Sequence, residues 1–344
     1  MAQIPPPYAY VDAYSHKTSY SLQYLLNLQR QFSGNWLVEL GYLGSQSHHL
    51  QGFQDGNQGT PGTTGSVTSR FPFPTYGVIQ LVADGANAVY NSLSAKATRR
   101  FSQGVSIISS FTWSKSIDDT SGIRVQGYDT LFPQNSYCIK CERGLSSFDT
   151  RARSVTSILY DLPIGKGKLI GTNNSVLNLV AGGWQAGGIL TMQKGLPGTL
   201  SIGGVDNAGS GAGGYDRPLS TGVSPYVSSP TPSRWLSLGA FTEAPPGQFG
   251  NVGRNTIIGP GIFAFDFEVH KQIAMPFNEK HKVQFRLEAF NVLNHPNWTM
   301  PNLNVLSGAI QAGQPGTAAH QSFGVITGTN VSMRQIQLGL KYTF

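Results

Sequence analysis

Two cysteines are the residues of this chain whose type and spacing are best suited to chemistry. Cys138 and Cys141 have the spacing of a redox motif or of half a zinc site. A structural zinc ion would need a second pair of ligands, and the sequence has no further CxxC or HxxxH pair. A thioredoxin-like site would need a βαβ context that this sequence does not provide. The pair therefore predicts either a local disulfide or two free thiols in a surface loop.

Two polar loop motifs suggest ligand binding more weakly. Gly209-x-Gly211-x-x-Gly214 has the letters of a dinucleotide fingerprint, but it does not join a strand to a helix, which that site requires. Asp206-Asn207 and Asp216 could contact a Ca²⁺ ion in the same loop, yet the twelve-residue EF-hand pattern is missing. Solvated loop polarity is the expected role of these groups.

Paired histidines and paired aspartates complete the candidates. His48-His49, with His16, could capture a metal or haem at a cell surface, but neighbours on a strand point to opposite faces. The same geometry argues against a shared substrate for Asp118-Asp119. No Ser/His/Asp or Cys/His arrangement stands out. We therefore expect no catalytic residue, no metal site, no cofactor and no enzymatic activity.

The composition favours a membrane protein without transmembrane helices. Only 12% of the 344 residues are charged, while Gly (42) and Pro (20) are abundant. Mean hydropathy is −0.16, and no apolar run approaches the roughly 18 residues of a membrane helix. The net charge of +7 suits nucleic acid or anionic lipid. Because the basic residues are scattered and form no basic run, nucleic acid is not an expected partner.

The last segment carries the clearest structural signal. Ile336, Leu338, Leu340, Tyr342 and Phe344 alternate with polar residues or glycine, so a strand here has one apolar and one wet face. The last residues of most soluble domains are poorly ordered. A transmembrane β-barrel instead uses its last strand to close the barrel, because a free edge is not tolerated in lipid. The alternative is a terminal strand of a soluble β-sandwich.

Similar period-2 segments recur along the chain and predict about nine strands. Their spans are 19–31, 36–44, 89–101, 104–115, 149–161, 183–194, 262–274, 281–292 and 333–344. Each is near the roughly 9–11 residues of a tilted membrane strand. In 262–274 and 281–292 we expect the charges on the face away from the aromatics, since Arg or Lys at the bilayer midplane costs about 2–4 kcal/mol. Aromatic residues near strand ends suggest interfacial girdles: Tyr20, Trp36, Tyr42, Trp113, Tyr160, Trp184, Tyr342 and Phe344.

The connections between these segments alternate in length. Short links at 32–35, 102–103 and 275–280 and a middling one at 162–182 alternate with long ones at 45–88, 116–148, 195–261 and 293–332. Such long loops are improbable in a compact soluble domain, whereas outer-membrane barrels alternate short periplasmic turns with long extracellular loops. The predicted fold is all-β, an antiparallel transmembrane β-barrel meander in the outer membrane.

The strand count and the first residues suggest a part of a larger barrel. An odd number of strands beginning outside, with 1–18 as the tail of an extracellular loop, does not close a bacterial single-chain barrel, which uses even numbers. Met1–Pro7 has neither a basic n-region nor an apolar h-region, so it is no signal peptide. We expect 1–344 to be the C-terminal portion of a barrel domain, with about nine or ten strands and no plug.

Several stretches together resemble a known family. They are Leu28–Phe32, Glu39–Ser45, Arg100–Gly104, Phe111–Asp119, Glu142–Arg151, Tyr160–Gly167 and, most specifically, Gly250–Asn255 with Arg286–Asn297. In this combination the chain resembles the barrel of TonB-dependent receptor-like proteins, in the Oar-like group that carries a carboxypeptidase-regulatory-like domain. The ending Gly339-x-x-Tyr342-x-Phe344 resembles the C-terminal signal that the outer-membrane assembly machinery recognises.

The resemblance implies a barrel of about 22 strands with a plugged lumen that captures a ligand and passes it inward. The expected partners are outer-membrane lipid and lipopolysaccharide, the assembly machinery and, through parts that this sequence lacks, the TonB system. Those missing parts would gate and energise transport, so we do not expect this chain to transport alone. A surface-structural or adhesive outer-membrane protein and a soluble secreted β-sandwich remain alternatives.

Overall fold

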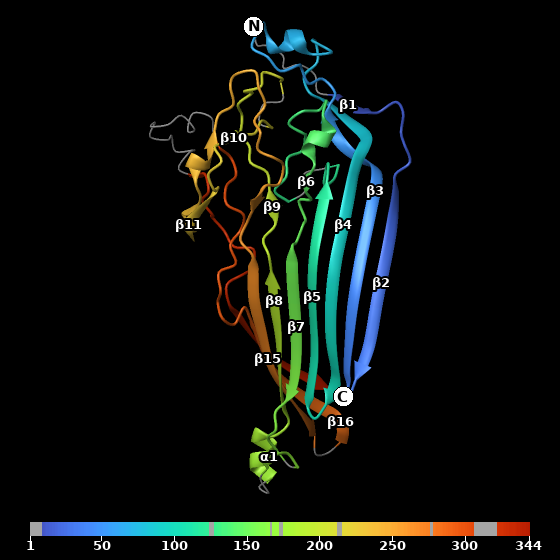
Figure 1. The fold of residues 1–344 in the computed structure, drawn as a ribbon. Helices are drawn as coiled ribbons and strands as arrows, with labels where there is room; N and C mark the ends of the chain where they lie inside the picture. Colours follow the sequence, from blue (N-terminus) through green and yellow to red (C-terminus); the bar gives the residue numbers. More distant parts are fainter. Residues whose placement is uncertain are drawn as a thin grey trace.

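One large antiparallel sheet dominates the computed structural model, which describes residues 9–123, 127–165, 167–171, 175–211, 215–275, 278–305 and 322–344. Figure 1 shows its long strands side by side, with the long connections gathered at one end. The order across the sheet is β17-β16-β15-β8-β7-β5-β4-β3-β2, so sequence neighbours are also neighbours in space. The predicted all-β antiparallel meander is therefore confirmed. Within the described residues the sheet is not closed, and β17 and β2 form its edges.

Each of the nine predicted spans overlaps one strand of this path. The strands are β2 (Tyr20–Phe32), β3 (Trp36–Asp55), β4 (Ile79–Ser102), β5 (Val105–Asp118), β7 (Ala152–Asp161), β8 (Trp184–Gln193), β15 (Ile262–Met275), β16 (Asn278–Phe290) and β17 (Gln335–Thr343). Two short strands join them, β1 (Ala9–Asp12) on β4 and β6 (Gly144–Leu145) on β5. The connections contain six further short strands: β9 (Pro197–Gly198), β10 (Leu219–Ser220), β11 (Tyr226–Thr231), β12 (Arg234–Leu236), β13 (Phe241–Thr242) and β14 (Ile257–Ile258). They also contain three short 3₁₀ helices, η1 (Val67–Arg70), η2 (Ile139–Glu142) and η3 (Leu238–Ala240), and the α-helix α1 (Ser175–Ala181).

Strand pairing builds one apolar and one polar face. Leu338 of β17 lies opposite Leu287 of β16, which lies opposite Val269 of β15. One residue along, Gln337 lies opposite Glu288. Because side chains alternate with a period of two, this register keeps apolar groups on one surface across the strands. We call these surfaces the apolar face and the polar face.

The long connections cover the polar face at one end of the strands. Ser114, Ser116 and Asp118 alternate along the end of β5 and are all buried. Ser114 Oγ donates to the carbonyl of Thr150, and the backbone N–H of Ser116 donates to Asp149. Trp113, on the other surface of the same strand, is 56% exposed. The apolar face is thus left open, as hydrocarbon requires, while protein covers the polar one.

The longest strands exceed their predicted lengths, so the predicted loop at 45–88 was wrong. β3 continues to Asp55 and β4 begins at Ile79, and these extensions pair with each other. The register shifts between Ser47 and Leu50, and His49 has a positive φ of 55°. This bulge interrupts the period-2 pattern, which concealed the continuing strand in the sequence.

A second correction concerns the charge on the apolar face. Lys271 lies opposite Trp184 and Phe285 in the register, hence among the aromatics and not away from them. Its ammonium group donates to the carbonyls of Leu179 and Val180 at the end of α1 and lies 5.5 Å from the Trp184 ring centre. Carbonyls at a helix C-terminus favour a cation, which explains why lysine is accepted here.

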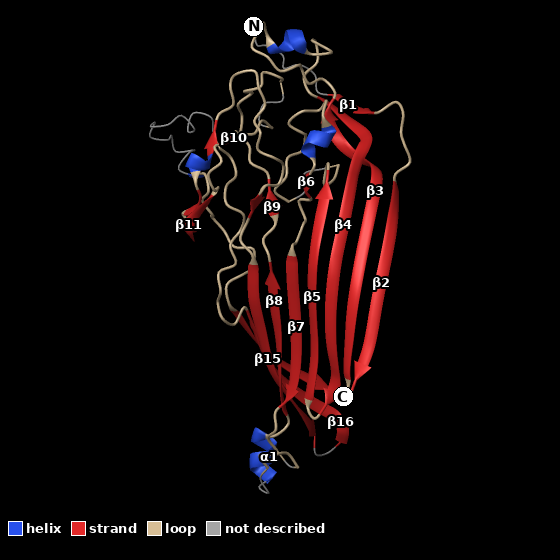
Figure 2. Cartoon of the chain, in the orientation of Figure 1, coloured by secondary structure: helices blue, strands red, loops and turns tan. Residues whose placement is uncertain are grey.

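The apolar core of the protein lies in the long connections and not in the sheet. We call the described parts of 56–78, 119–151, 194–261 and 291–334 the loop layer; Figure 2 shows them as mainly tan segments at one end of the strands. The core cluster consists of Leu200, Ile202, Leu236, Ala240, Phe241, Val252, Ile257, Met300, Val305 and Phe323. All of its members come from 194–261 and 291–334, so these two connections fold against each other.

The opposite end of the strands carries the short turns and α1, with the end of the chain beside them (Figure 1). α1 lies within the middling link that joins β7 to β8. Among the described residues, no helix has the length and apolarity needed to cross a membrane.

Candidate functional site

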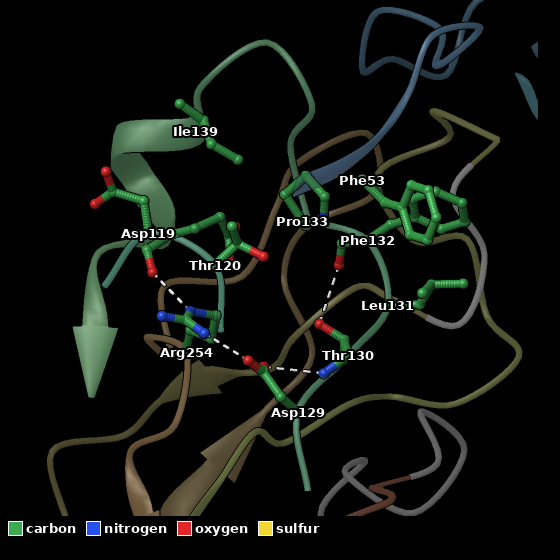
Figure 3. Close-up of a pocket in the computed structure, with 11 residues that line it drawn as sticks. Phe53, Asp119, Thr120, Asp129, Thr130, Leu131, Phe132, Pro133, Ile139 and Arg254 are labelled. Carbon is green, nitrogen blue, oxygen red and sulfur yellow. Dashed lines mark hydrogen bonds and ion pairs between the residues drawn. The ribbon is translucent and has the colours of Figure 1, made fainter. Parts of the chain in front are cut away.

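A buried arginine is the centre of the loop layer. Arg254 follows β13 in the third long connection and is only 5% exposed. Its guanidinium forms ion pairs with Asp118, at the end of β5, and with Asp129, whose Oδ2 lies 2.5 Å from Nη1. Figure 3 shows Arg254 directed at Asp129. One side chain therefore joins the sheet to two different connections.

Every N–H of this guanidinium has an acceptor. Nε donates to the carbonyl of Glu142 at 2.8 Å, Nη1 to Ser121 and Asp129, and Nη2 to the carbonyl and carboxylate of Asp118. Arginine carries five such donors in a rigid fork. Burial lowers the pKa of Arg254, but the carboxylates of Asp129 and Asp118 outweigh it and raise that pKa above its ordinary value. The group stays charged at any physiological pH.

A second buried ion pair lies next to the first. Arg217 and Glu142 contact each other with side chains that are each 3% exposed. The other oxygen of Glu142 accepts from the backbone N–H of Gln134, and the Gln134 side chain binds Arg217 N–H and the carbonyl of Gly250. A Cβ at Gly250 would lie 1.9 Å from the Arg217 carbonyl, so only glycine allows this approach.

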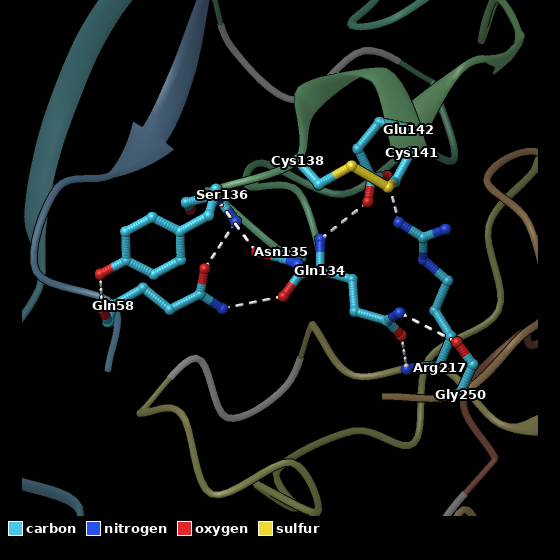
Figure 4. Close-up of a disulfide and its surroundings, with 10 residues drawn as sticks. Gln58, Gln134, Asn135, Ser136, Cys138, Cys141, Glu142, Arg217 and Gly250 are labelled. Atoms are coloured by element: carbon cyan, nitrogen blue, oxygen red, sulfur yellow. Dashed lines mark hydrogen bonds and ion pairs between the residues drawn. A yellow bond between two sulfur atoms is a disulfide. The ribbon is translucent and has the colours of Figure 1, made fainter. Parts of the chain in front are cut away.

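The first connection joins the same network through Gln58, as Figure 4 shows. Its Nε2 donates to the Gln134 carbonyl at 2.8 Å, and its Oε1 accepts from the backbone N–H of Ser136 at 2.5 Å. The phenol of Tyr137 donates to the Gln58 carbonyl. Three of the four long connections are therefore held together by hydrogen bonds and ion pairs between buried polar groups.

Cys138 and Cys141 form a disulfide beside this network. The bond closes the turn in which η2 begins, where Cys141 N–H also donates to the Cys138 carbonyl at 2.9 Å. Glu142 follows directly, so the disulfide constrains the turn that presents Glu142 to Arg217 (Figure 4). The geometry gives the two cysteines a structural role.

The cavity beside Arg254 is too small for a ligand. Phe53, Phe132, Asp129 and Arg254 are among the residues that line it (Figure 3), and its volume is about 10 Å³. That volume holds about one water molecule. The arrangement can therefore hold the connections in one conformation, but it offers no room for a substrate.

The structure separates the paired aspartates and gives each its own partner. Asp118 binds Arg254, whereas Asp119 lies 3.3 Å from Arg143 and accepts from the backbone N–H of Asn87. Asp206 accepts from the N–H groups of Ser210 and Gly211. These carboxylates therefore form their ion pairs and hydrogen bonds with groups of the protein itself.

The glycine motif serves close packing. A Cβ at Gly209 would lie 2.3 Å from the carbonyl of Gly62, and one at Gly211 would lie 2.4 Å from the ring of Phe71. Arg70 donates to the carbonyls of Gly209 and Gly62. Gly214, the last residue of the motif, lies outside the described residues.

The paired histidines do not point to opposite faces, so that prediction was wrong. The bulge at His49 brings both rings to Tyr20, with ring centres 5.2 Å and 5.7 Å away. His48 contacts Asn87, and His16 contacts Asp84 at 2.8 Å. Across the described part of the chain, no group of three or more His, Cys, Asp or Glu residues could hold a metal ion.

The C-terminal residues that resemble an assembly signal lie on the exposed edge strand. Tyr342 is 51% exposed, and its hydroxyl lies 2.6 Å from Nδ1 of His281. Its ring centre is 6.3 Å from that of Phe344. Gly339 pairs with Arg286 of β16.

Sequence reasoning missed the arginines that organise the loop layer. Arg254 and Glu142 lie in stretches that resemble a known family, but the sequence assigned neither a role of its own. Arg217 lies in none of these stretches. A usable signal existed, because charged residues are rare in this chain and three of the family-like stretches each contain at least one. Asp118, Glu142 and Arg254 come from those stretches, and they meet in space.

Asp216 makes the loop layer sensitive to pH. It is 1% exposed; its Oδ2 accepts from Ala208 N–H at 2.8 Å, and its Oδ1 has no partner among the described residues. Burial, and then the charge of Asp206, raise its pKa from 3.8 to about 6. The folded state thus binds a proton that the unfolded state releases. The contribution of Asp216 to the free energy of unfolding is complete below about pH 4. It is lost as the pH rises through 6, and the loss is at most about 3 kcal/mol.

We expect Asp216→Asn to abolish this pH dependence. Hydrogen exchange of the loop layer in the wild type should accelerate between pH 4 and pH 7, after correction for intrinsic exchange, and should stay nearly flat in the variant. Asp12→Asn, at an exposed position, is the control and should behave as the wild type. Equal pH profiles for wild type and Asp216→Asn would contradict the assignment.

The model of a family described as outer membrane beta barrel domain matches residues 2–337. No curated protein matches the chain. Three similar solved structures are the outer membrane transporter YddB from Escherichia coli, the FrpB iron transporter from Neisseria meningitidis and the copper transporter OprC.

Identity to these three proteins is low. It is 13%, 12% and 10%, with TM-scores of 0.47, 0.42 and 0.39. The alignments cover 95%, 97% and 95% of this chain but only 33%, 32% and 32% of the other chains. The chain thus spans about a third of the length of the transporters that it resembles.

Proposed function

Because this chain belongs to the outer membrane β-barrel domain family, we propose that it forms part of the wall and the outer loop layer of a TonB-dependent receptor-like transporter. The protein lies in the outer membrane. Transport itself, the dependence on TonB and the Oar-like grouping are the finer parts of the proposal. They are supported by the sequence resemblance and by the loop layer.

The loop layer is the observation that carries the proposal. Long surface connections usually vary in conformation, yet here Arg254 and Arg217 hold two of them in place through buried ion pairs, and Gln58 joins a third through hydrogen bonds. Binding sites on loops are positioned by a rigid scaffold. A fixed layer over the polar face is the arrangement that a surface receptor needs to present one binding surface.

The assembly machinery would recognise Gly339 and Tyr342 of β17 and Phe344, which directly follows that strand. The TonB system would act through segments of a longer protein. No catalytic step and no cofactor are part of the proposal.

Uptake by living cells tests this function. Cells with and without the gene would receive a defined pool of iron chelates, copper complexes, short peptides and oligosaccharides, and mass spectrometry would measure their loss from the medium. We expect at least one compound to be depleted by the wild type but neither by the deletion strain nor by a strain without TonB. Restoring the gene should restore uptake.

Two results would contradict the proposal. Identical depletion of every compound by wild type and deletion strain would exclude transport of these classes and favour a structural or adhesive role. Depletion that needs the gene but persists without TonB would exclude the energised mechanism.

A further inference from the structure

Exposed apolar side chains lie at the short-turn end of the strands, in the link that joins β7 to β8. In α1, Leu179 is 56% exposed and Val180 is 66% exposed, and Ala181 after them is exposed as well. Figure 1 shows α1 beyond the ends of β7 and β8, at the opposite end of the strands from the loop layer. More than half of Leu179 and of Val180 is therefore left uncovered by the described part of the chain.

The end of α1 is attached to the apolar face of the sheet. Lys271 and Trp184 lie opposite each other in the register of β15 and β8, on that face. The Lys271 ammonium donates to the carbonyls of Leu179 and Val180. Nε1 of Trp184 donates to the Val180 carbonyl at 3.0 Å, and its ring packs edge-on against Phe285. The exposed side chains of α1 therefore continue the surface that faces hydrocarbon.

The last carbonyls of α1 are satisfied by the protein itself. The Asn178 carbonyl accepts from the backbone N–H of Gly182 at 3.0 Å, and the next two carbonyls accept from the lysine and the tryptophan of the apolar face. A helix that ends in water can leave such carbonyls to the solvent. In surroundings poor in water, every backbone polar group needs a partner within the protein. The capped end of α1 therefore suits a place where water is scarce.

The contact lies at the periplasmic boundary of the membrane. Trp184 is the first residue of β8, and it lies at the end of the strands that carries the short turns, which is the periplasmic end of such barrels. Tryptophan is enriched at membrane boundaries because its ring is apolar while its N–H is polar. Apolar side chains of a helix at this level reach about 5–10 Å into the boundary between headgroups and acyl chains.

We propose that the end of α1 inserts into the periplasmic leaflet of the outer membrane, with Leu179 and Val180 between headgroups and acyl chains. The partner is a lipid surface. Phospholipids of any headgroup suit it, because the charge of Lys271 is already paired with carbonyls. The link between β7 and β8 thereby opposes tilting of the barrel, as interfacial anchors do for membrane helices. The inference does not depend on transport.

Fluorescence quenching by brominated lipid tests the insertion, in the full-length protein folded into phosphatidylcholine vesicles. Ala181→Cys would carry an environment-sensitive fluorophore, and the protein without this cysteine gives the background. No reductant is used, so the Cys138–Cys141 disulfide stays unlabelled. We expect blue-shifted emission, with stronger quenching by lipid brominated near the headgroup than by lipid brominated near the chain end. Brominated lipid fills both leaflets, so the orientation of the protein does not affect the result.

Two further labelled positions set the limits of this measurement. Leu338→Cys, near the middle of β17 on the apolar face, should be quenched most by lipid brominated near the chain end. Ser228→Cys, at an exposed position of β11 in the loop layer, should not be quenched. The fluorophore at Ala181 is expected to lie between these two in depth.

Polar substitutions test the two side chains themselves. Leu179→Asn with Val180→Thr nearly keeps the size of both side chains and removes their apolar character. Burial of the exposed parts of a leucine and a valine favours the membrane by roughly 30-fold. The membrane-bound fraction of α1, and with it the quenching at Ala181, should therefore fall by about half or more.

The other arm of the same link supplies the matched control. Leu169 and Ile170 are 92% and 63% exposed, but the neighbouring Lys168 lies 3.6 Å from Asp161, on the polar face. Leu169→Asn with Ile170→Thr makes a similar change in this arm and should leave the quenching at Ala181 unchanged. Heat-modifiable mobility on gels checks that every variant is folded.

The outcomes separate insertion from exposure to water. Quenching at Ala181 that weakens only in the variant of Leu179 and Val180 would support the proposal. Quenching no stronger than at Ser228 would overturn it and leave these side chains to a periplasmic protein. Quenching that both double variants lower equally, or that neither of them lowers, would also overturn it, because the two side chains of α1 would then not be what enters the membrane.

Discussion

Replacing Arg254 by alanine is expected to release the loop layer while leaving the sheet assembled. The change leaves the carboxylates of Asp118 and Asp129 buried without their cation. Removing one partner of a buried ion pair typically costs about 3–5 kcal/mol. At about 1.4 kcal/mol per factor of ten, the open loop layer should become roughly 100- to 3,000-fold more populated.

Limited proteolysis of intact outer membranes measures this effect. Cleavage within 194–261 should become fast in Arg254→Ala, whereas heat-modifiable mobility should show that the barrel is still folded. Arg143→Ala is the matched control, since Arg143 pairs with Asp119 but is 47% exposed, and exposed pairs contribute only about 0–1 kcal/mol. Equal protease resistance of Arg254→Ala and Arg143→Ala would show that the ion pairs do not hold the layer.

Removal of all three charges provides a further check. Buried ion pairs are often no more stabilising than well-packed neutral groups of similar volume. Arg254→Met combined with Asp118→Asn and Asp129→Asn should therefore recover much of the resistance that Arg254→Ala loses. Such recovery would identify the unpaired carboxylates as the cause of the loss.

Leu338→Arg is expected to destabilise the assembled protein strongly. Leu338 lies near the middle of β17, on the apolar face, and is 66% exposed. An arginine that faces lipid near the bilayer midplane costs about 2–4 kcal/mol, which lowers the ratio of folded to unfolded protein by roughly 30- to 1,000-fold. Equilibrium unfolding by denaturant in lipid vesicles measures the change.

The neighbouring residue supplies the control. Gln337 lies on the polar face, opposite Glu288. Gln337→Arg introduces the same charge on the other surface and creates an opposite-charge pair across two strands, worth about 0.2–1 kcal/mol. We expect unchanged or slightly raised stability. Equal losses for Leu338→Arg and Gln337→Arg would mean that the two faces do not differ in their surroundings.

The sheet could be predicted because its signal is local. A strand with one apolar face shows the period of two in its own residues, as Ile336 to Phe344 do, without any knowledge of its partner. The lengths of the connections then predicted the meander, since short turns join strands that are antiparallel neighbours. The extension of β3 beyond 44 escaped this logic because the bulge at His49 shifts the register and breaks the period.

At the α1 end of the strands, a contact between residues distant in the sequence again decided what the local sequence could not indicate. The expectation that charges avoid the aromatic side of 262–274 failed at Lys271, which is 6% exposed. What makes the lysine acceptable is a pair of carbonyls, those of Leu179 and Val180. They lie roughly 90 residues away in the chain, and nothing in the sequence around Lys271 indicates them.

By itself, the sequence of this protein determined the all-β meander, its two unlike faces and its place in the outer membrane, because each follows from alternation within single segments and from the lengths between them. Only the tertiary structure decided that the long connections form a packed layer. Arg254 meets Asp118 across 136 positions of the chain and Asp129 across 125. Such pairs leave no periodic trace, since a buried ion pair depends on where two distant side chains meet and not on the residues beside them.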